Sequence, residues 1–139
     1  LTGDEEPAAI RAAAHEDINL ITILPAANEP GLQVLANDGS WLEVPCDFGN
    51  LIVNIGDMLS MWSNGRYAST VHRVVNMTGK ERYSIPFFLN PDVGTTVESL
   101  PTCQRKGEPP RYKAKPSHEI LSRRYQESFV HLKDGKEEK

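Results

Sequence analysis

Short apolar runs rich in β-branched and aromatic residues alternate with turn-forming residues along the first 90 residues of the chain. Runs of this length, bounded by Gly, Asn, Asp and Pro, are typical of β-strands joined by tight turns. The runs that we expect to form strands are 18–24, 32–35, 41–44, 51–55, 59–62, 67–75 and 82–89. The clearest turn signal is "NDGS", which is typical of a β-hairpin. With a further strand near residue 15, the pattern predicts about eight strands between residues 9 and 90.

Many short strands with regular turns predict a mainly β fold, and a jelly roll is the closed arrangement with about this number of strands. We therefore expect residues 1–91 to form a jelly-roll core. Residues 92–116 contain several prolines and little periodicity, which predicts a loop that wraps the surface. Residues 117–132 are expected to form a C-terminal helix and residues 133–139 a frayed tail. Ser117 is its expected N-cap, and its expected apolar face comprises Ile120, Leu121, Tyr125 and Phe129.

Composition narrows the possible partners. The chain has 139 residues, a net charge of -4 and an ordinary share of hydrophobic residues, 39%. These values fit one globular domain and argue against a general binder of nucleic acid or of anionic membranes. No apolar stretch approaches the roughly 18 residues of a membrane span. Cys46 and Cys103 are far apart and match no metal motif, so we expect free thiols and a cytoplasmic location.

The first candidate site lies in "AAAHEDINL". In a β-strand, residues two apart point to the same face, so His15 and Asp17 would share a face if a strand continued through both. An imidazole and a carboxylate on one face can be neighbouring metal ligands. His72 is the best candidate for a third ligand, because His118 and His131 lie in the C-terminal segment. Two histidines and one carboxylate form the facial triad of non-haem Fe(II) oxygenases.

The second candidate site lies in "KERYSIPFFL". Arg82 and Ser84 are also two apart, so they would share a face of the expected strand. A guanidinium can bind a carboxylate through two parallel hydrogen bonds, and a nearby hydroxyl can donate a third. An arginine among Ile85, Phe87 and Phe88 would be costly to bury without an anion as partner. The alternative for this residue is an ordinary ion pair with a nearby acid.

The combination of "HED", a later histidine in "TVHRVV" and then "RYS" resembles the catalytic core of the Fe(II)/2-oxoglutarate-dependent oxygenases. This group includes isopenicillin N synthase and the iron/ascorbate oxidoreductases. The resemblance runs from about residue 11 to residue 91 and extends to "GLQVLANDGSWLEV", "LIVNIGDMLSMWSNGRYAS" and "RYSIPFFLNP". The later segment "PPRYKAKPSHEILSRRYQESF" resembles the C-terminal helix of the same family.

This resemblance implies a double-stranded β-helix, which is a jelly-roll variant, with His15, Asp17 and His72 as metal ligands. It also implies that Arg82 and Ser84 hold the distal carboxylate of 2-oxoglutarate. The reaction implied is oxidative decarboxylation of 2-oxoglutarate to succinate, coupled to hydroxylation or a related oxidation of a small organic substrate. The cofactors implied are Fe(II), 2-oxoglutarate as cosubstrate and molecular oxygen, with ascorbate as a further candidate.

Two features differ from the family pattern. Glu16 stands between His15 and Asp17 where plant members mostly carry a small residue, and we expect it to point away from the metal. The family also has an Asn-x-Tyr motif upstream, and residues 1–14 contain no tyrosine. We therefore expect this chain to be the C-terminal catalytic portion, with a jelly roll that is incomplete by itself. The N-terminal portion of the same protein is expected to pack on this core.

Positions around the site are candidates for contacts with the small-molecule substrate. They lie on the ligand strand, on the "VNIGD" segment and beside the arginine, and they are Leu20, Thr22, Asn54, Phe87 and Phe88. The sequence is also compatible with two other functions. One is an oxidase of the isopenicillin N synthase type, in which Arg82 and Ser84 would hold a substrate carboxylate without 2-oxoglutarate. The other is a non-catalytic, cupin-like metal-binding module.

Overall fold

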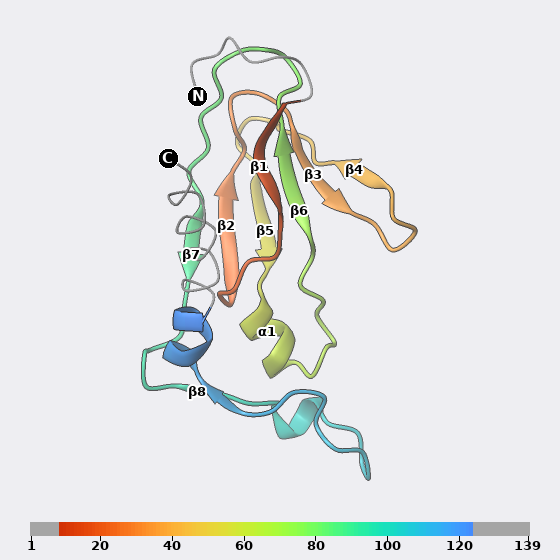
Figure 1. Ribbon diagram of the computed structural model, residues 1–139, viewed down its shortest axis with the longest axis vertical. Coiled ribbons are helices and arrows are strands. Elements are labelled where there is room, and N and C mark those ends of the chain that lie inside the picture. Colours follow the sequence, from red (N-terminus) through yellow and green to blue (C-terminus); the bar gives the residue numbers. More distant parts are fainter. Residues whose placement is uncertain (1–8, 124–139) are drawn as a thin grey trace, which may run out of the picture.

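Two antiparallel sheets enclose a cavity in the computed structural model, which describes residues 9–123 (Figure 1). The larger sheet has the order β1 (Ile10–His15), β6 (His72–Val75), β3 (Leu32–Leu35) and β4 (Trp41–Glu43). The smaller sheet has the order β5 (Leu51–Ile55), β2 (Ile21–Pro25) and β7 (Phe87–Leu89). This arrangement confirms the mainly β fold that the alternation of apolar runs and turns predicts.

The smaller sheet has one face toward the cavity and one face away from it. Thr22 pairs with Asn54 on one side and with Phe88 on the other, and all three line the cavity. Because side chains alternate along a strand, the neighbouring positions occupy the outer face. By this alternation the outer face is apolar and comprises Ile21, Ile23, Leu51, Val53, Ile55, Phe87 and Leu89. Val53 and Ile55 also border the cavity.

The described residues bury few large apolar side chains. The buried apolar residues are Leu32, Met58, Val75 and Val97. Met58 belongs to a short helix, α1 (Asp57–Trp62), which closes one end of the two sheets. The prediction of a strand over 59–62 was therefore wrong. This run consists of Met, Leu, Ser and Trp, which are residues without β-branching, and Met and Leu are good helix formers.

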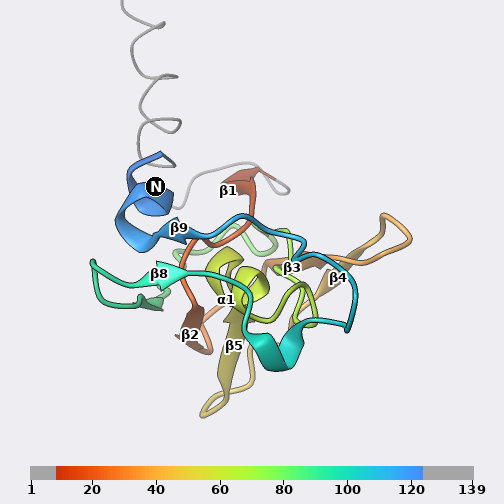
Figure 2. The same ribbon diagram turned by 90° about the horizontal axis from the view of Figure 1, so that it is seen from below.

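A layer of irregular chain covers α1 (Figure 2). It contains β8 (Thr96–Val97), a turn of 3-10 helix, η1 (Pro101–Cys103), and β9 (Lys115–Pro116), which pairs with β8. The Leu100 amide donates to the Trp62 carbonyl, and the Ser99 hydroxyl donates to the Met61 carbonyl. The expected loop over 92–116 thus contains short regular elements that hold it against α1.

The expected C-terminal helix is present over residues 117–123. The Ser117 side chain does not cap it as predicted, because its hydroxyl donates toward the carbonyls of Asp92 and Val93. That contact ties the start of the helix to the chain before β8. The predicted apolar positions Tyr125 and Phe129, the rest of the expected helix and the expected tail lie outside the described residues.

Several predicted strands are shorter in the structure. The run 67–75 is a strand only from His72, and the run 82–89 is a strand only from Phe87. Pro86 precedes that second strand, and a proline has no amide hydrogen for a sheet ladder, so the chain before it stays irregular. The strand that carries His15 ends there, and Asp17 lies in the following loop. The condition under which both residues would share one face of a strand therefore does not hold.

Two further features concern the cysteines and the helices. Cys46 and Cys103 are both free thiols. Within residues 9–123, no helix has the length and apolar character that crossing a membrane requires. The cytoplasmic location stays a prediction.

Candidate metal centre

The two histidines of the candidate triad lie on neighbouring strands. His15 is the last residue of β1 and His72 is the first residue of β6, and the two residues are paired in register. Their rings are 4.3 Å apart between centroids and tilted by 51°. Figure 1 shows β1 and β6 side by side over the smaller sheet. Strand pairing thus places both imidazoles at one end of the cavity.

Asp17 reaches the same place from the loop between β1 and β2. The amide of Asp57 donates to the Asp17 carbonyl at 2.7 Å, and the amide of Met58 donates to the Asn19 carbonyl at 3.1 Å. These bonds fix the loop against the first turn of α1. The side chain of Asp17 is 7% exposed, and its Oδ1 lies 3.8 Å from Nε2 of His15 and of His72.

These three side chains fit a metal ion. One ligand atom from each lies within 4.8 Å of the others, and no other such group of His, Cys, Asp and Glu occurs in residues 9–123. Donors at neighbouring corners of an octahedron with bonds of about 2.1 Å are about 3.0 Å apart. The 3.8 Å separations from Asp17 Oδ1 to each Nε2 are wider than this, and small side-chain movements would bring the three donors onto one ion. Two imidazoles and one carboxylate are the donors that non-haem Fe(II) sites use. Glu16 is not part of this group.

Hydrogen bonds to the backbone determine which imidazole nitrogen is free to bind. Nδ1 of His15 lies 2.7 Å from the Ala13 carbonyl oxygen, and Nδ1 of His72 lies 3.1 Å from the Thr70 carbonyl oxygen. A carbonyl oxygen only accepts hydrogen bonds, so in each ring Nδ1 carries the proton. When Nδ1 carries the only proton of the ring, Nε2 keeps its lone pair, and in both histidines Nε2 faces Asp17. This pattern is common for histidines that bind metals.

The other carboxylate oxygen of Asp17 has two protein donors. Thr22 Oγ1 donates to Oδ2 at 2.6 Å, and Asn54 Nδ2 donates to the same atom at 2.7 Å. Asn19 Nδ2 in turn donates to Thr22 Oγ1 at 3.0 Å and to the Ile21 carbonyl at 2.8 Å. Thr22 and Asn54, which were expected among the substrate contacts, hold a candidate metal ligand in the structure. Asn19 was not expected at the site, and the one signal for it in the sequence is its place two residues after Asp17.

The triad opens into a cavity of about 420 Å³ between the two sheets. Its apolar lining includes Leu24, Leu32, Val34, Ile52, Val74 and Phe88. Arg82 and Ser84 line the same cavity, as do Thr22 and Asn54. Leu20 and Phe87 do not line it, because Leu20 precedes β2 and Phe87 lies on the outer face. The structure thus brings together all predicted site residues except these two.

Arg82 is a partly buried cation. Its Nε donates to the Glu29 carbonyl at 3.0 Å, and within residues 9–123 no carboxylate lies within ion-pair distance of it. Burial lowers the pKa of the Arg82 guanidinium below its ordinary value, and the nearby charge of Arg11 lowers it further. A guanidinium with a second cation nearby and no acid as partner favours binding of an anion. This arrangement speaks against the alternative of a local ion pair with an acid.

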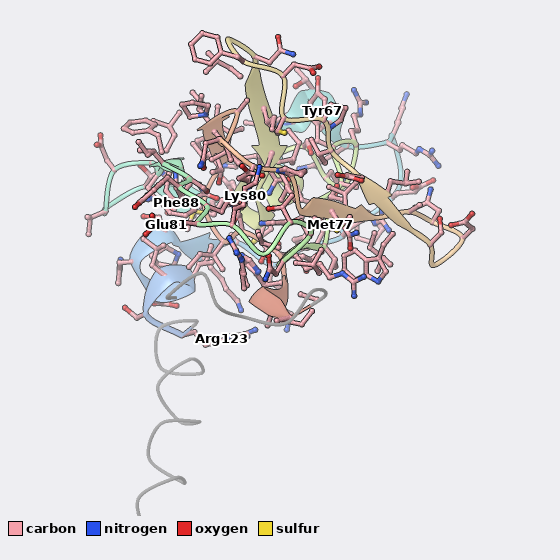
Figure 3. All side chains as sticks on the ribbon, turned by 90° about the horizontal axis from the view of Figure 1, so that it is seen from above. Tyr67, Met77, Lys80, Glu81, Phe88 and Arg123 are labelled. Atoms are coloured by element: carbon pink, nitrogen blue, oxygen red, sulfur yellow. The ribbon has the colours of Figure 1, made fainter. Side chains whose placement is uncertain are left out.

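The chain between β6 and β7 covers the end of the two sheets that lies opposite to α1. The segment that carries Met77, Lys80 and Glu81 crosses the end of the sheets opposite to α1 (Figure 3). The Asn28 side chain accepts from the Tyr83 amide and donates to the Glu81 carbonyl. These bonds attach the irregular segment before β7 to the loop after β2. Arg82 and Ser84 are therefore held in place although they lie outside a strand.

Comparison with protein families gives a match to the model described as the 2OG-Fe(II) oxygenase superfamily, over residues 3–91. The chain is 39% identical over 126 residues to the 2-oxoglutarate-Fe(II) type oxidoreductase hxnY of Emericella nidulans, covering 90% of this chain and 36% of that protein. It is 42% identical over 132 residues to kihadalactone A synthase LFS of Citrus sinensis, covering 91% and 39%. The chain thus spans well under half the length of these relatives.

Solved structures show the same likeness. A full-length Neurospora crassa protein in complex with alpha-KG superposes with a TM-score of 0.81 at 33% identity, covering 88% of this chain and 39% of that one. The dioxygenase for auxin oxidation from rice superposes with a TM-score of 0.81 at 27% identity, covering 91% and 44%. The fold is therefore that of the double-stranded β-helix, of which this chain covers a part.

Proposed function

This chain belongs to the 2OG-Fe(II) oxygenase superfamily, and from that premise we propose that its protein couples decarboxylation of 2-oxoglutarate to oxidation of a small organic molecule. The observation that carries the proposal is the shared cavity. It holds two imidazoles and a carboxylate at one end, and its lining includes a guanidinium that has no acidic partner within residues 9–123. The first set of groups fits Fe(II), and the guanidinium fits the distal carboxylate of a dicarboxylic acid.

Each residue has a role that follows from its contacts. His15 and His72 offer Nε2 in the correct tautomer, and Asp17 offers a buried, oriented carboxylate oxygen. Fe(II) held by these three residues would supply the means to activate oxygen. Arg82 holds the cosubstrate by charge and hydrogen bonds, and Ser84 can donate a further hydrogen bond. The apolar part of the lining lowers the polarity around these groups, which strengthens their electrostatic interactions.

The substrate class stays broad in this proposal. Related proteins include gibberellin 2-beta-dioxygenase of Phaseolus coccineus, homoarginine-6-hydroxylase 2-ODD-C23 of Glycine max and the Neurospora crassa protein, which was also solved with thymine. These names point to small molecules of very different polarity. The largely apolar lining of the cavity supports a small organic molecule with an apolar part that lies next to the metal.

We also propose that another part of the same protein covers the outer face of the smaller sheet. This face presents seven apolar side chains, among them Leu51, Val53 and Phe87, which are 64%, 56% and 60% exposed. Contiguous apolar surface of this kind usually marks an interface. The relatives are more than twice as long as this chain, so a covering segment within one polypeptide is a natural occupant.

The full-length protein tests the proposed function directly. Loaded anaerobically with Fe(II), it is exposed to oxygen with 2-oxoglutarate and a panel of small organic molecules, and succinate and product are both measured. We expect one panel member to stimulate succinate formation in step with its own oxidation. Oxidation of a panel member without consumption of 2-oxoglutarate would instead indicate an oxidase of the isopenicillin N synthase type. Metal binding without any turnover across the panel would favour a binding module.

A further inference from the structure

The two carboxylate oxygens of Asp17 have different environments. Oδ1 faces Nε2 of His15 and of His72, whereas Oδ2 accepts short hydrogen bonds from Thr22 and Asn54. We propose that Thr22 and Asn54 make Asp17 a one-oxygen metal ligand by occupying Oδ2, which keeps a coordination position open. This inference rests on the proposed function, because it assumes that the triad binds a divalent metal.

The two donors come from a cross-strand pair. Thr22 on β2 and Asn54 on β5 are directly paired in register, so their side chains project side by side into the cavity. Thr22 is 4% exposed and Asp17 is 7% exposed, so water competes little for these bonds. A carboxylate oxygen has two lone-pair sites in its plane, and two donors at 2.6 and 2.7 Å use both of them.

The network behind Thr22 fixes the direction of its hydrogen bond. Asn19 Nδ2 donates to Thr22 Oγ1, so the hydroxyl acts as acceptor there and its single hydrogen is free for Asp17. Asn19 is 2% exposed and also donates to the Ile21 carbonyl, which orients its amide. The chain of donors thus runs from Asn19 through Thr22 to Oδ2.

Asn54 is also oriented toward Asp17. Its Nδ2 lies 2.7 Å from Oδ2 and 3.4 Å from Nδ1 of His72. That nitrogen of His72 carries a proton directed at the Thr70 carbonyl, so it cannot accept from Asn54. The amide hydrogen therefore goes to Asp17, and Asn54 packs against the ring of His72 without competing for its hydrogen bond.

The consequence concerns the number of free coordination positions. An octahedral ion held by three single donors keeps about three positions for other ligands, and a chelating carboxylate would reduce this to about two. A keto acid that binds through two atoms would then leave no position for oxygen. Thr22 and Asn54 are positioning residues in this view, since they act through Asp17 and not on the reacting molecules.

The test counts water molecules on bound Mn(II), which replaces Fe(II) in sites of this kind and is read by its magnetic resonance signal in ¹⁷O-enriched water. The variants Thr22→Val and Asn54→Leu, each in the full-length protein, remove one donor while keeping side-chain volume. Mn(II) is supplied in excess so that a weakened site is still filled. We expect about three waters in the unaltered protein and a loss of about one in either variant, with Mn(II) affinity about tenfold weaker.

Controls separate this inference from the proposed function. Thr22→Ser keeps the hydroxyl and should restore the count, and Thr102→Val makes the same exchange as Thr22→Val at an exposed position of η1 outside the cavity and should leave it unaltered. If the unaltered protein binds no Mn(II), the proposed metal site fails. If it binds Mn(II) and both donor variants keep the same number of waters, with or without weaker affinity, Thr22 and Asn54 do not set how Asp17 binds. Either variant suffices should the other not fold.

Discussion

His15 and His72 are cross-strand partners in the pair formed by β1 and β6, and their ring nitrogens Nε2 each lie 3.8 Å from Oδ1 of Asp17. The register of one strand pair therefore determines the separation of two ligands that are far apart in the sequence. The third ligand is supplied by a loop that α1 holds in place. The candidate site thus depends on few contacts, and each of them can be altered separately.

Removal of one histidine should abolish tight metal binding. His72→Ala deletes one of three donors, so we expect Fe(II) affinity to fall by more than the roughly 10–100-fold that loss of a residue orienting a ligand costs. Equilibrium dialysis under anaerobic conditions measures this affinity. His118→Ala is the matched control, because Nδ1 of His118 contacts the Val93 carbonyl and His118 does not line the cavity. Equal affinity of the two variants would contradict the assignment of the triad.

Arg82 should be required for binding of 2-oxoglutarate but not of metal. Burial and Arg11 lower the pKa of Arg82, so its charged form carries a desolvation cost that an anion relieves. An arginine with a lowered pKa still loses its proton only well above neutral pH. Arg82 is therefore charged throughout the neutral range, and the desolvation cost of its charge disappears only in strong base. In Arg82→Met we expect the dissociation constant of 2-oxoglutarate to rise about 10–100-fold, with Fe(II) affinity retained.

Thermal unfolding is an independent test of the role of Arg82 in binding 2-oxoglutarate. 2-Oxoglutarate should raise the melting temperature of the unaltered protein and should not raise that of Arg82→Met, because ligands stabilise only the state that binds them. Arg105→Met is the control, since Arg105 is exposed and paired with Glu108. An unchanged response in Arg82→Met would show that the carboxylate binds elsewhere.

Gly56 should be essential for the loop that carries Asp17. A Cβ atom at this position would overlap the carbonyl oxygen and the side-chain oxygen of Asn19. We expect Gly56→Ala to destabilise the fold by about 1–3 kcal/mol through overpacking, measured by urea unfolding. Gly94→Ala should change stability little, because no heavy atom outside its chain neighbours lies within 4 Å of its added Cβ and its φ is not positive. If the two substitutions changed the free energy of unfolding equally, Asn19 would have to shift at no cost to make room for the added Cβ at Gly56, which would contradict this prediction.

The apolar outer face of the smaller sheet should be covered in the full-length protein. Phe87→Ser should then destabilise that protein by about 3–5 kcal/mol, as expected for truncating a buried aromatic side chain. Phe48, which is fully exposed, lies in the turn between β4 and β5, and Phe48→Ser should change stability by less than about 0.5 kcal/mol. Equally small effects of both substitutions in urea unfolding would show that the face stays exposed.

The sequence predicted the mainly β fold well, because turn residues and short β-branched runs are local signals. It failed for α1, where a run of four residues without β-branching has no periodicity that separates helix from strand. It also extended the strands at His15 and before Phe87. After His15 the chain leaves the sheet toward α1, whose first amide binds the Asp17 carbonyl. Before Phe87, Pro86 and the bond from the Tyr83 amide to the loop after β2 keep the chain out of the sheet.

Within the site, the sequence predicted residue types more reliably than roles. The triad and Arg82 were recognisable because few other functions need those groups in that order. The hydrogen bonds of Thr22 and Asn54 to Asp17 depend on the register between β2 and β5, which the sequence does not reveal. For the same reason, the alternation of Phe87 and Phe88 between the two faces of their strand was predictable, but not which of the two lines the cavity.

The most direct test of the proposed site is the weak visible charge-transfer band that Fe(II) forms with 2-oxoglutarate when both bind one centre. It is recorded anaerobically in the full-length protein and in the variants Asp17→Ala, His72→Ala and Arg82→Met. We expect the band in the unaltered protein, its loss in the first two variants, and its return in the third only at much higher 2-oxoglutarate concentration. Absence of the band from the unaltered protein, or a band of unchanged strength in Asp17→Ala and His72→Ala, would contradict a shared iron and 2-oxoglutarate site in this cavity.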